Sequence, residues 1–482
     1  MRVKTFFSDR QFRDSNSAVQ LCNKHLEDAI IELGHQLIPF EFDPNPIKSQ
    51  IFIPWDHLKS KQSFELLSSD IAIFCDRGVA LVRSTFKAKS EKNILFLHGL
   101  AYNIDLIKSL EDIDIIITPS LYWAEVTQMM IGGKIIRSIH DFDFQYISAS
   151  SRQNTVIYPL DPPIQIISAQ IGDEKSKLMN RIGITYSNQT ILAHSIQPNK
   201  ASFSAYVGII IALAIRYRKV NKHLKVVTSR IDHEKIFSVI GKIYNEYEHD
   251  YAFSFTLKDA EECFVFTDKL SQKHLHQLFR ASSFGISYND VPESFGMYVL
   301  ESIANHCPVF SNGAGNMRHS LPTNHGHYIS ESFGIYDSSA TACMELALEI
   351  IFKLEDQNLH EELQAGYSYI ISKYNIRDFK KNIRNILNLA KSKDISTRSP
   401  SFLFHQTKSI SHQSHLQISP LVRSFSRKDR VVMADHQNFK LTDREFNEFM
   451  LIFDGHNEAL SSSQNACFDI LIDMGLICKF ES

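Results

Sequence analysis

Several features that would place the chain in a class of protein are missing from its sequence. None of its seven cysteines stands in a C-x-x-C pair, which argues against a disulfide framework and predicts reduced thiols, as in the cytoplasm. The formal net charge is only −3, so the chain has no overall basic field with which to bind nucleic acid. No D-x-D pair stands at the end of a predicted strand in a metal-ligand context, so a metal site is not expected.

Long apolar segments are also missing. Residues 1–12 contain no long apolar region, so no signal peptide is expected there. The longest apolar run, Val207–Ile215, is too short to cross a bilayer and predicts a buried helix instead. With 482 residues, of which 44% are hydrophobic, the chain is long enough for two large domains and a small one. We therefore expect a cytoplasmic protein with no transmembrane segment.

The first 170 residues alternate between apolar runs and amphipathic segments. Continuous apolar runs at Ile71–Phe74, Ile94–Leu97 and Ile113–Thr118 are typical of parallel strands that are buried on both faces. The segment Ala18–Leu33 has the periodicity of an amphipathic helix. This alternation predicts an α/β fold, with a Rossmann-like domain over residues 1–170.

A second alternating region, residues 186–373, contains the most informative part of the chain. Its pattern predicts a strand at Phe284–Tyr288, a helix from about Phe295 to Asn305 and a further strand at Pro308–Ser311. Because ligands bind at the carboxyl edge of parallel sheets, the loops that follow these two strands are expected to form a binding site.

Two glutamates lie eight residues apart in this region. Glu293 lies in the loop before the predicted helix and Glu301 on the helix, so both side chains can reach a crevice at the edge of the sheet. Four backbone N–H groups at the positive end of this helix would suit a diphosphate: those of Ser294, Phe295, Gly296 and Met297.

This stretch resembles the signature of the family 4 type retaining glycosyltransferases, roughly E-x-F-G-x-x-x-x-E-x-x-A-x-G-x-P-V. The matching residues are Glu293, Phe295, Gly296, Glu301, Ala304, Pro308 and Val309, and Cys307 stands in place of the family's glycine. The resemblance implies the GT-B fold, in which two Rossmann-like domains face a cleft. It also implies transfer of a sugar, with retention, from a UDP- or GDP-type nucleotide sugar to an acceptor. In that reaction Glu293 would bind sugar hydroxyls and Glu301 the ribose, and neither a cofactor nor a metal would be needed.

The resemblance extends to residues outside this stretch. His98, directly after the strand Ile94–Leu97, stands where a family histidine lies beside the donor sugar and the leaving phosphate. Lys200 matches a family lysine that contacts the donor diphosphate, whereas Ser195 stands where the family has an arginine. Arg230 is a candidate replacement for that missing charge. The resemblance thus implies catalytic roles for Glu293, His98 and Lys200, and donor contacts from Glu301, Ser294, Phe295, Gly296, Met297, Ser195 and Arg230.

The remaining residues are predicted to add a helix, a linker and a small module. In GT-B proteins the last helix crosses back to the first domain, and residues 374–390 are placed to do so. Residues 391–420 are rich in Ser, His and Gln and predict a linker. Residues 421–482 resemble small α+β winged-helix domains that bind leader peptides in peptide-modifying enzymes, although any small cap would fit as well. That likeness implies a peptide or protein acceptor, taken up at the strand edge Arg430–Met433.

Two other functions fit the same residues. The serine at position 195 and the absence of glycine from residues 8–17 are what a decayed GT-B site would show. Such a chain would be a non-catalytic nucleotide-sugar- or peptide-binding protein. A GT-B phosphorylase would instead depend on inorganic phosphate, so turnover of a nucleotide-sugar donor separates the three functions.

Overall fold

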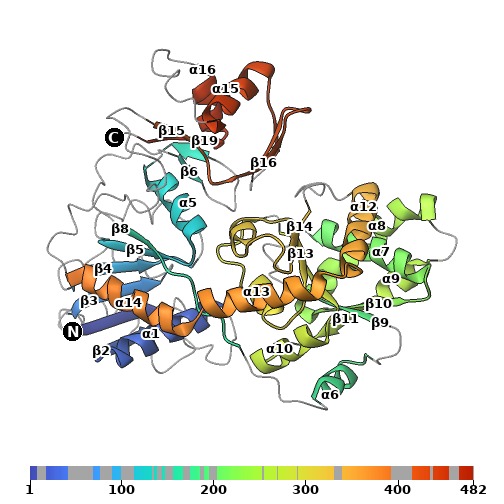
Figure 1. The fold of residues 1–482 in the computed structure, drawn as a ribbon, viewed down its shortest axis with the longest axis horizontal. Coiled ribbons are helices and arrows are strands. Elements are labelled where there is room, and N and C mark those ends of the chain that lie inside the picture. The colour runs from blue at the N-terminus through green and yellow to red at the C-terminus, as the bar shows by residue number, and fades with distance from the viewer. Residues whose placement is uncertain are drawn as a thin grey trace. The chain divides into compact units, whose positions relative to one another are not determined.

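The structure is a computed structural model of the chain (Figure 1). It describes residues 1–7, 18–41, 69–75, 90–98, 113–132, 135–137, 144–146, 156–166, 174–184, 189–194, 203–251, 255–268, 270–289, 291–330, 339–391, 415–434, 438–454 and 466–480. The chain divides into two compact units. Unit 1 comprises Met1–Pro163, Ile376–Val432 and Lys440–Ser482, and unit 2 comprises Ile164–Asn375 and Met433–Phe439.

Unit 1 is built around a parallel six-stranded sheet in the order β2-β1-β3-β4-β5-β8. Its strands are β1 (Arg2–Phe7), β2 (Gln36–Glu41), β3 (Ser69–Cys75), β4 (Ser90–Phe96), β5 (Ile115–Thr118) and β8 (Val156–Pro159), and β6 (Ile135–Arg137) pairs with β7 (Phe144–Tyr146) in a separate antiparallel ribbon. The register sets Val3 opposite Ile71 and Ile94 opposite Ile115, so buried side chains meet across the sheet. The strands predicted from continuous apolar runs are thereby confirmed.

Helices α1 (Ala18–Glu32), α5 (Leu121–Gly132) and α14 (Ile376–Lys391) belong to the same unit. The last of these helices is amphipathic and packs beside α1 (Figure 1). It buries one face in the hydrophobic core of the first sheet, through Phe379, Ile383, Ile386, Leu387 and Ala390. Their spacing repeats with the helical period, which is why this segment forms a helix against that core.

Unit 2 contains a second parallel six-stranded sheet, in the order β11-β10-β9-β12-β13-β14. Its strands are β9 (Gln189–His194), β10 (His223–Ser229), β11 (Phe264–Thr267), β12 (Phe284–Ser287), β13 (Val309–Ser311) and β14 (His327–Ile329). Its helices are α6 (Glu174–Arg181), α7 (Phe203–Arg218), α8 (His233–Tyr251), α9 (Leu257–Glu262), α10 (Gln272–Ala281), α11 (Met297–Ile303), α12 (Ala340–Leu354) and α13 (Leu359–Lys373), with 3-10 turns at η5 (Arg230–Asp232) and η6 (Asn316–His319). The apolar run Val207–Ile215 lies within α7 and is buried throughout, as its composition predicts.

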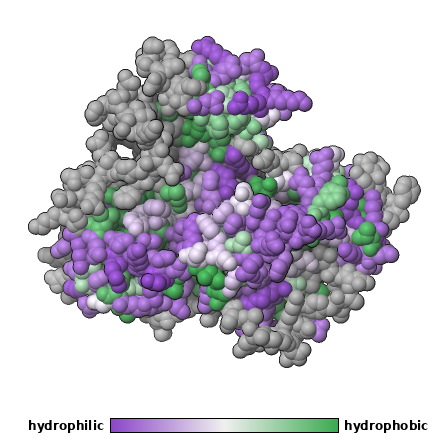
Figure 2. Space-filling view, in the orientation of Figure 1, coloured by the Kyte–Doolittle hydropathy of each residue, from purple (hydrophilic) through white to green (hydrophobic). Residues whose placement is uncertain are grey.

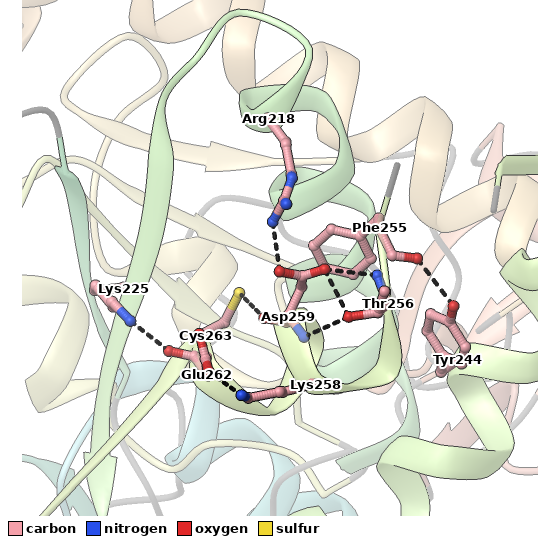
Figure 3. A network of polar contacts seen from close by, with 9 residues as sticks. All are labelled: Arg218, Lys225, Tyr244, Phe255, Thr256, Lys258, Asp259, Glu262 and Cys263. Carbon is pink, nitrogen blue, oxygen red and sulfur yellow. Dashed lines mark hydrogen bonds and ion pairs between the residues drawn. The ribbon is translucent and has the colours of Figure 1, made fainter. Parts of the chain in front are cut away.

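A network of polar contacts ties α9 to the end of α7 and to β10 (Figure 3). Thr256 caps the helix by accepting from the N–H of Asp259 at 3.2 Å, and Asp259 Oδ2 accepts in return from the N–H of Thr256 at 2.7 Å. Arg218 at the end of α7 contacts Asp259 Oδ1 at 2.5 Å. Lys225 on β10 donates to the carbonyl of Glu262, which ties the end of α9 to the sheet.

Replacing Asp259 with alanine is expected to lower the free energy of unfolding by about 1 kcal/mol, because the capping box loses one of its two hydrogen bonds. Burial acts to raise the pKa of Asp259, but the bonds from Thr256 and Arg218 outweigh it and hold that pKa below the ordinary value. The stabilisation is therefore present above the unfolded-state pKa of about 4 and is lost as the pH falls below it. Urea titrations at pH 7 and pH 3 measure this, with Glu261→Ala on the same helix as the control. An equal deficit at both pH values would contradict the assignment.

The C-terminal region, called the module below, has α+β composition and belongs to unit 1 except for Met433–Phe439, which belong to unit 2. It comprises β15 (His415–Ile418), β16 (Val422–Ser426), β17 (Val431–Ala434), β18 (Asn438–Lys440), α15 (Asp443–Phe453), α16 (Ala466–Asp473) and β19 (Ile477–Phe480). Two corrections to the sequence analysis follow. β15 pairs with β19, so the predicted linker 391–420 extends too far and the module includes His415. β17 is the middle strand of a three-stranded sheet, β16-β17-β18, so the predicted peptide edge at Arg430–Met433 is wrong because both of its sides are paired.

The surface in view is mostly hydrophilic over the described residues (Figure 2). Large apolar side chains with more than half of their surface exposed are spread over separate elements: Ile31, Leu121, Val220 and Phe352. In the described part of the chain no helix combines the length and hydropathy needed to cross a membrane. Six cysteines in that part are buried, free thiols: Cys22, Cys263, Cys307, Cys343, Cys467 and Cys478.

Candidate functional site

The candidate site lies at the carboxyl edge of the second sheet. Its strand order places β9 beside β12, with β10 and β11 on one side and β13 and β14 on the other. The connections after β9 and β12 therefore leave in opposite directions, which makes this position the topological switch point where such sheets bind ligands. The loop after β12 contains Glu293. Ser195 and Lys200 follow β9 but lie outside the described residues, so their roles remain predictions.

Backbone hydrogen bonds tie the Glu293 loop to the glycine-containing loop after β13. The N–H of Glu293 donates to the carbonyl of Ala314 at 3.3 Å, and the N–H of Asn316 donates to the carbonyl of Glu293 at 2.7 Å. These bonds form an isolated parallel bridge between Glu293 and Gly315. The main chain at Glu293 is thus held on both sides, while its side chain remains partly accessible.

Asparagine side chains complete this connection between the two loops. Asn312 accepts from the N–H of Asn289 at 3.3 Å and donates to the carbonyl of Asn289 at 2.9 Å. Asn316 donates to the carbonyl of Phe295 at 2.7 Å. Both asparagines that reach across, Asn312 and Asn316, are buried. A buried amide that satisfies backbone groups holds a loop in one conformation, so the position of Glu293 is fixed before any ligand arrives.

Helix α11 follows Glu293 and begins at a glycine in the left-handed region. Gly296, the N-cap, has φ 92° and ψ 40°, a conformation that a residue with a Cβ rarely adopts. The first intrahelical bonds run from Val299 and Leu300 to the carbonyl of Gly296. The side chain of Phe295 is buried and packs edge-on against Tyr374, with ring centroids 5.5 Å apart. The helix has only seven residues, so its dipole contributes less than that of a longer helix.

Glu301 is buried on α11 and faces α10. Its Oε1 atom lies 2.6 Å from the side-chain amide of Gln272, and 5% of the residue's surface is exposed. Burial raises the pKa of Glu301 to about 7, and the Gln272 hydrogen bond offsets only part of this rise. Asn305 donates to the backbone carbonyl of Glu301 and contacts Nδ1 of His276.

His98 lies in unit 1, at the end of β4. It is buried, its ring packs against Phe96 with centroids 4.1 Å apart, and its Nε2 lies 2.8 Å from Oδ1 of Asn23. Because an amide oxygen only accepts, Nε2 carries the ring proton. Burial lowers the pKa of His98 to about 3, so the imidazole is neutral at pH 7. A neutral ring can donate or accept a hydrogen bond but does not supply a positive charge.

Arg230 lies directly after β10, in η5. Its Nε atom is 3.0 Å from Oδ1 of Asp268, which follows β11, and both side chains are largely exposed. An exposed pair of this kind contributes little stability, so the guanidinium can leave Asp268 for another anion at small cost. Nothing in the described residues joins Arg230 to Glu293 or Glu301 by a hydrogen bond or an ion pair. In the same part of the chain, no group of three or more His, Cys, Asp or Glu could hold a metal ion.

The sequence analysis missed the residues that support the two glutamates. Gln272 and His276 lie 29 and 25 positions before Glu301 and come near it only when α10 packs against α11, whereas Asn305 lies four positions after it. Asn312 was identified only as a loop residue. The glycine at position 315 was the only available signal, because a glycine beside asparagines after a strand indicates a constrained loop.

Comparisons with known proteins identify the fold. No protein-family model and no curated protein matches the sequence. Among solved structures, the chain is similar to sucrose-phosphate synthase from Thermosynechococcus elongatus, with a TM-score of 0.56, 10% identity and coverage of 80% of this chain and 98% of that one. A glycosyltransferase from Rickettsia africae gives a TM-score of 0.57 and 16% identity, over 83% and 99% of the two chains. Anabaena HepE in complex with UDP-glucose gives a TM-score of 0.54 and 13% identity, over 80% of this chain and 99% of that one.

These likenesses confirm the predicted α/β class and the GT-B fold. At 10–16% identity they concern the fold alone. The winged-helix likeness of the C-terminal module and the roles of individual residues remain predictions.

Proposed function

We propose that this protein is a glycosyltransferase that moves a sugar from a nucleotide-sugar donor of the UDP or GDP type to an acceptor. The observation that carries the proposal is the position of Glu293, held by backbone bonds on both sides at the switch point of the second sheet. Its support comes from a fold shared with glycosyltransferases, one of them solved with UDP-glucose. A fold alone does not define a reaction, so the site must carry the argument.

The proposed division of roles follows the environments of the residues. Glu293 would bind sugar hydroxyls, because its loop is fixed and its side chain is partly accessible. Glu301, on the helix behind it, would bind the ribose. Lys200, Ser195, Arg230 and the N–H groups of residues 294–297 would stabilise the diphosphate as it leaves, and preorganised donors of this kind are usually the largest catalytic contribution.

The reaction would retain the configuration of the donor sugar and need no metal. Neutral His98 would act as a hydrogen-bonding group beside the donor, not as a cation. No carboxylate is assigned as a nucleophile.

A screen for donors tests the proposal directly. Thermal shifts with UDP, GDP and their sugar conjugates should identify one nucleotide that stabilises the protein, since a ligand present at about 100 times its Kd adds roughly 2.7 kcal/mol. The matching nucleotide sugar should then be hydrolysed slowly without an acceptor, and equally fast with EDTA. Stabilisation without any turnover would favour the alternative, a non-catalytic nucleotide-sugar-binding protein with a decayed GT-B site. Turnover that requires inorganic phosphate would favour a phosphorylase.

The module from His415 onward is proposed to hold a peptide or protein acceptor. Its described sheets have outer strands, among them β16, that could pair with an extended peptide. Holding an acceptor near the site raises its effective concentration without a new catalytic contact.

Removing residues 415–482 should leave donor hydrolysis within about twofold but raise the acceptor concentration needed for transfer by at least about tenfold. Rates of both reactions on the truncated and full-length chains measure this. If the module is only a structural cap, its loss should change solubility or assembly while the acceptor dependence stays constant.

A further inference from the structure

Four polar side chains form a closed network between α10 and α11. Nε2 of Gln272 lies 2.6 Å from Oε1 of Glu301 and 3.1 Å from Nε2 of His276. Nδ2 of Asn305 lies 3.0 Å from Nδ1 of His276 and 2.7 Å from the backbone carbonyl of Glu301. His276, Glu301 and Asn305 are buried, at 0%, 5% and 5% exposure, so mismatched donors and acceptors here are costly.

The orientation of Asn305 determines the tautomer of His276. The carbonyl of Glu301 can only accept, so the amide nitrogen of Asn305 must face it, and the second N–H of that nitrogen points at Nδ1 of His276. Nδ1 is therefore an acceptor. Burial, and next the charge of Arg280, lower the pKa of His276 to about 4. The ring is thus neutral at pH 7, and its single proton is on Nε2.

The protonated Nε2 of His276 then constrains Gln272 and, through it, Glu301. Nε2–H needs an acceptor, and the amide of Gln272 provides one when a half-turn exchanges its oxygen and nitrogen. That oxygen also faces Oε1 of Glu301, so Glu301 must carry a proton to donate to it. If Glu301 is ionised, Gln272 must turn its NH2 group to the carboxylate, and this NH2 then meets the N–H of His276. The protonated carboxyl group therefore gives Nε2–H of His276 an acceptor without setting two donors against each other.

We propose that Gln272 and His276 are positioning residues that hold Glu301 as a neutral carboxylic acid in the unliganded protein, and that binding of a nucleoside diphosphate releases its proton. Ribose hydroxyls donate more strongly to a carboxylate than to a neutral acid, so the ligand favours the ionised form. The release of a proton on nucleotide binding rests on the proposed function, whereas the neutral state of Glu301 in the unliganded protein does not.

The surroundings of the network contain few other charges. Arg280 on α10 acts on His276, and Gln272 is the polar side chain that acts on Glu301. Helix α6 packs against α10, and α13 packs against α11. Among the described residues neither helix contributes a charge that acts on Glu301 or His276.

Unfolding measurements without any ligand test whether Glu301 is a neutral acid in the folded protein. A carboxyl group whose pKa is raised on folding destabilises the folded state as the pH rises between its unfolded and folded values, about 4.3 and 7, by roughly tenfold in the unfolding constant per pH unit. Glu301→Gln keeps the shape and presents an NH2 group to Gln272, as the protonated acid does. The Tm advantage of this variant over the wild type should therefore be larger at pH 7.5 than at pH 5.

His276→Leu distinguishes positioning from packing. Without the imidazole, Gln272 can turn its NH2 to an ionised Glu301, which lowers the folded-state pKa of that carboxyl group. The Tm advantage of Glu301→Gln at pH 7.5 should therefore shrink when both chains are compared in the His276→Leu background. The control is His274→Leu on the same helix, which should leave the profile unchanged. Parallel profiles of wild type and Glu301→Gln between pH 5 and 7.5 would overturn the proposal.

Calorimetry tests the release of a proton. Titrations with UDP and GDP at pH 6.5, in two buffers of different ionisation enthalpy, give the number of protons released. The wild type should release about half a proton or more beyond Glu301→Gln, and the titration of the diphosphate itself cancels in this difference. Equal release would overturn the coupling. If the pH profiles of the wild type and Glu301→Gln diverge but neither nucleotide binds, Glu301 is a neutral acid and the proposed function is contradicted instead.

Discussion

Replacing Glu293 with glutamine is expected to reduce sugar transfer by about 10²- to 10³-fold, the cost of removing one preorganised contact to the transition state. The fold should survive, because the bonds that hold this position run through the backbone of Glu293, Ala314 and Asn316. The substitution removes a charge and leaves those bonds in place. The Kd of the free nucleoside diphosphate should change little, since Glu293 is proposed to bind the sugar.

Three measurements make this prediction specific. Steady-state transfer gives the loss in kcat, calorimetry gives the affinity for the free nucleotide, and thermal unfolding shows whether the protein is intact. Glu345→Gln, an exposed glutamate on α12, is the matched control and should behave as the wild type does. Near-native turnover in Glu293→Gln would remove this residue from the site, and a large loss of Tm would assign it to the fold instead.

Much of the fold could be predicted from the sequence because parallel strands leave a strong local signal. Strands such as β5 and β12 are short segments without charged residues, and both are buried along their whole length. The position of Glu293 between a strand and a helix could be predicted for a similar reason, because it is set by neighbours in the sequence.

The features that were missed depend on contacts between distant parts of the chain. The pairing of β15 with β19 joins His415 to Phe480, and nothing in residues 391–420 distinguishes a strand from a linker. Gln272 and His276 look like ordinary helix residues until α10 packs against α11. The role of these two side chains depends on which atoms donate and which accept hydrogen bonds, and a sequence pattern does not contain this information.

Gly315→Ala is expected to reduce transfer by about 10²-fold without touching a catalytic side chain, because a displacement of about 1 Å at a reacting group has that effect. Gly315 has a φ of 64°, and a Cβ built on it would lie 2.5 Å from both the backbone nitrogen and the carbonyl oxygen of Glu293. Backbone atoms at that distance cannot yield as a flexible side chain does. The two loops must separate, and Glu293 must move with them.

Gly313→Ala is the matched control, since it lies in the same loop with nearly the same φ, 65°. A Cβ there would be 3.0 Å from a side-chain methyl of Ile329, which can move. Both variants should lose roughly 1–3 kcal/mol of stability, because a residue with a Cβ rarely adopts a positive φ. Only Gly315→Ala should also lose turnover, and a Glu293→Gln change added to it should cost little more, because both act on one contact. Equal turnover in the two glycine variants would show that the Gly315 bridge does not position Glu293.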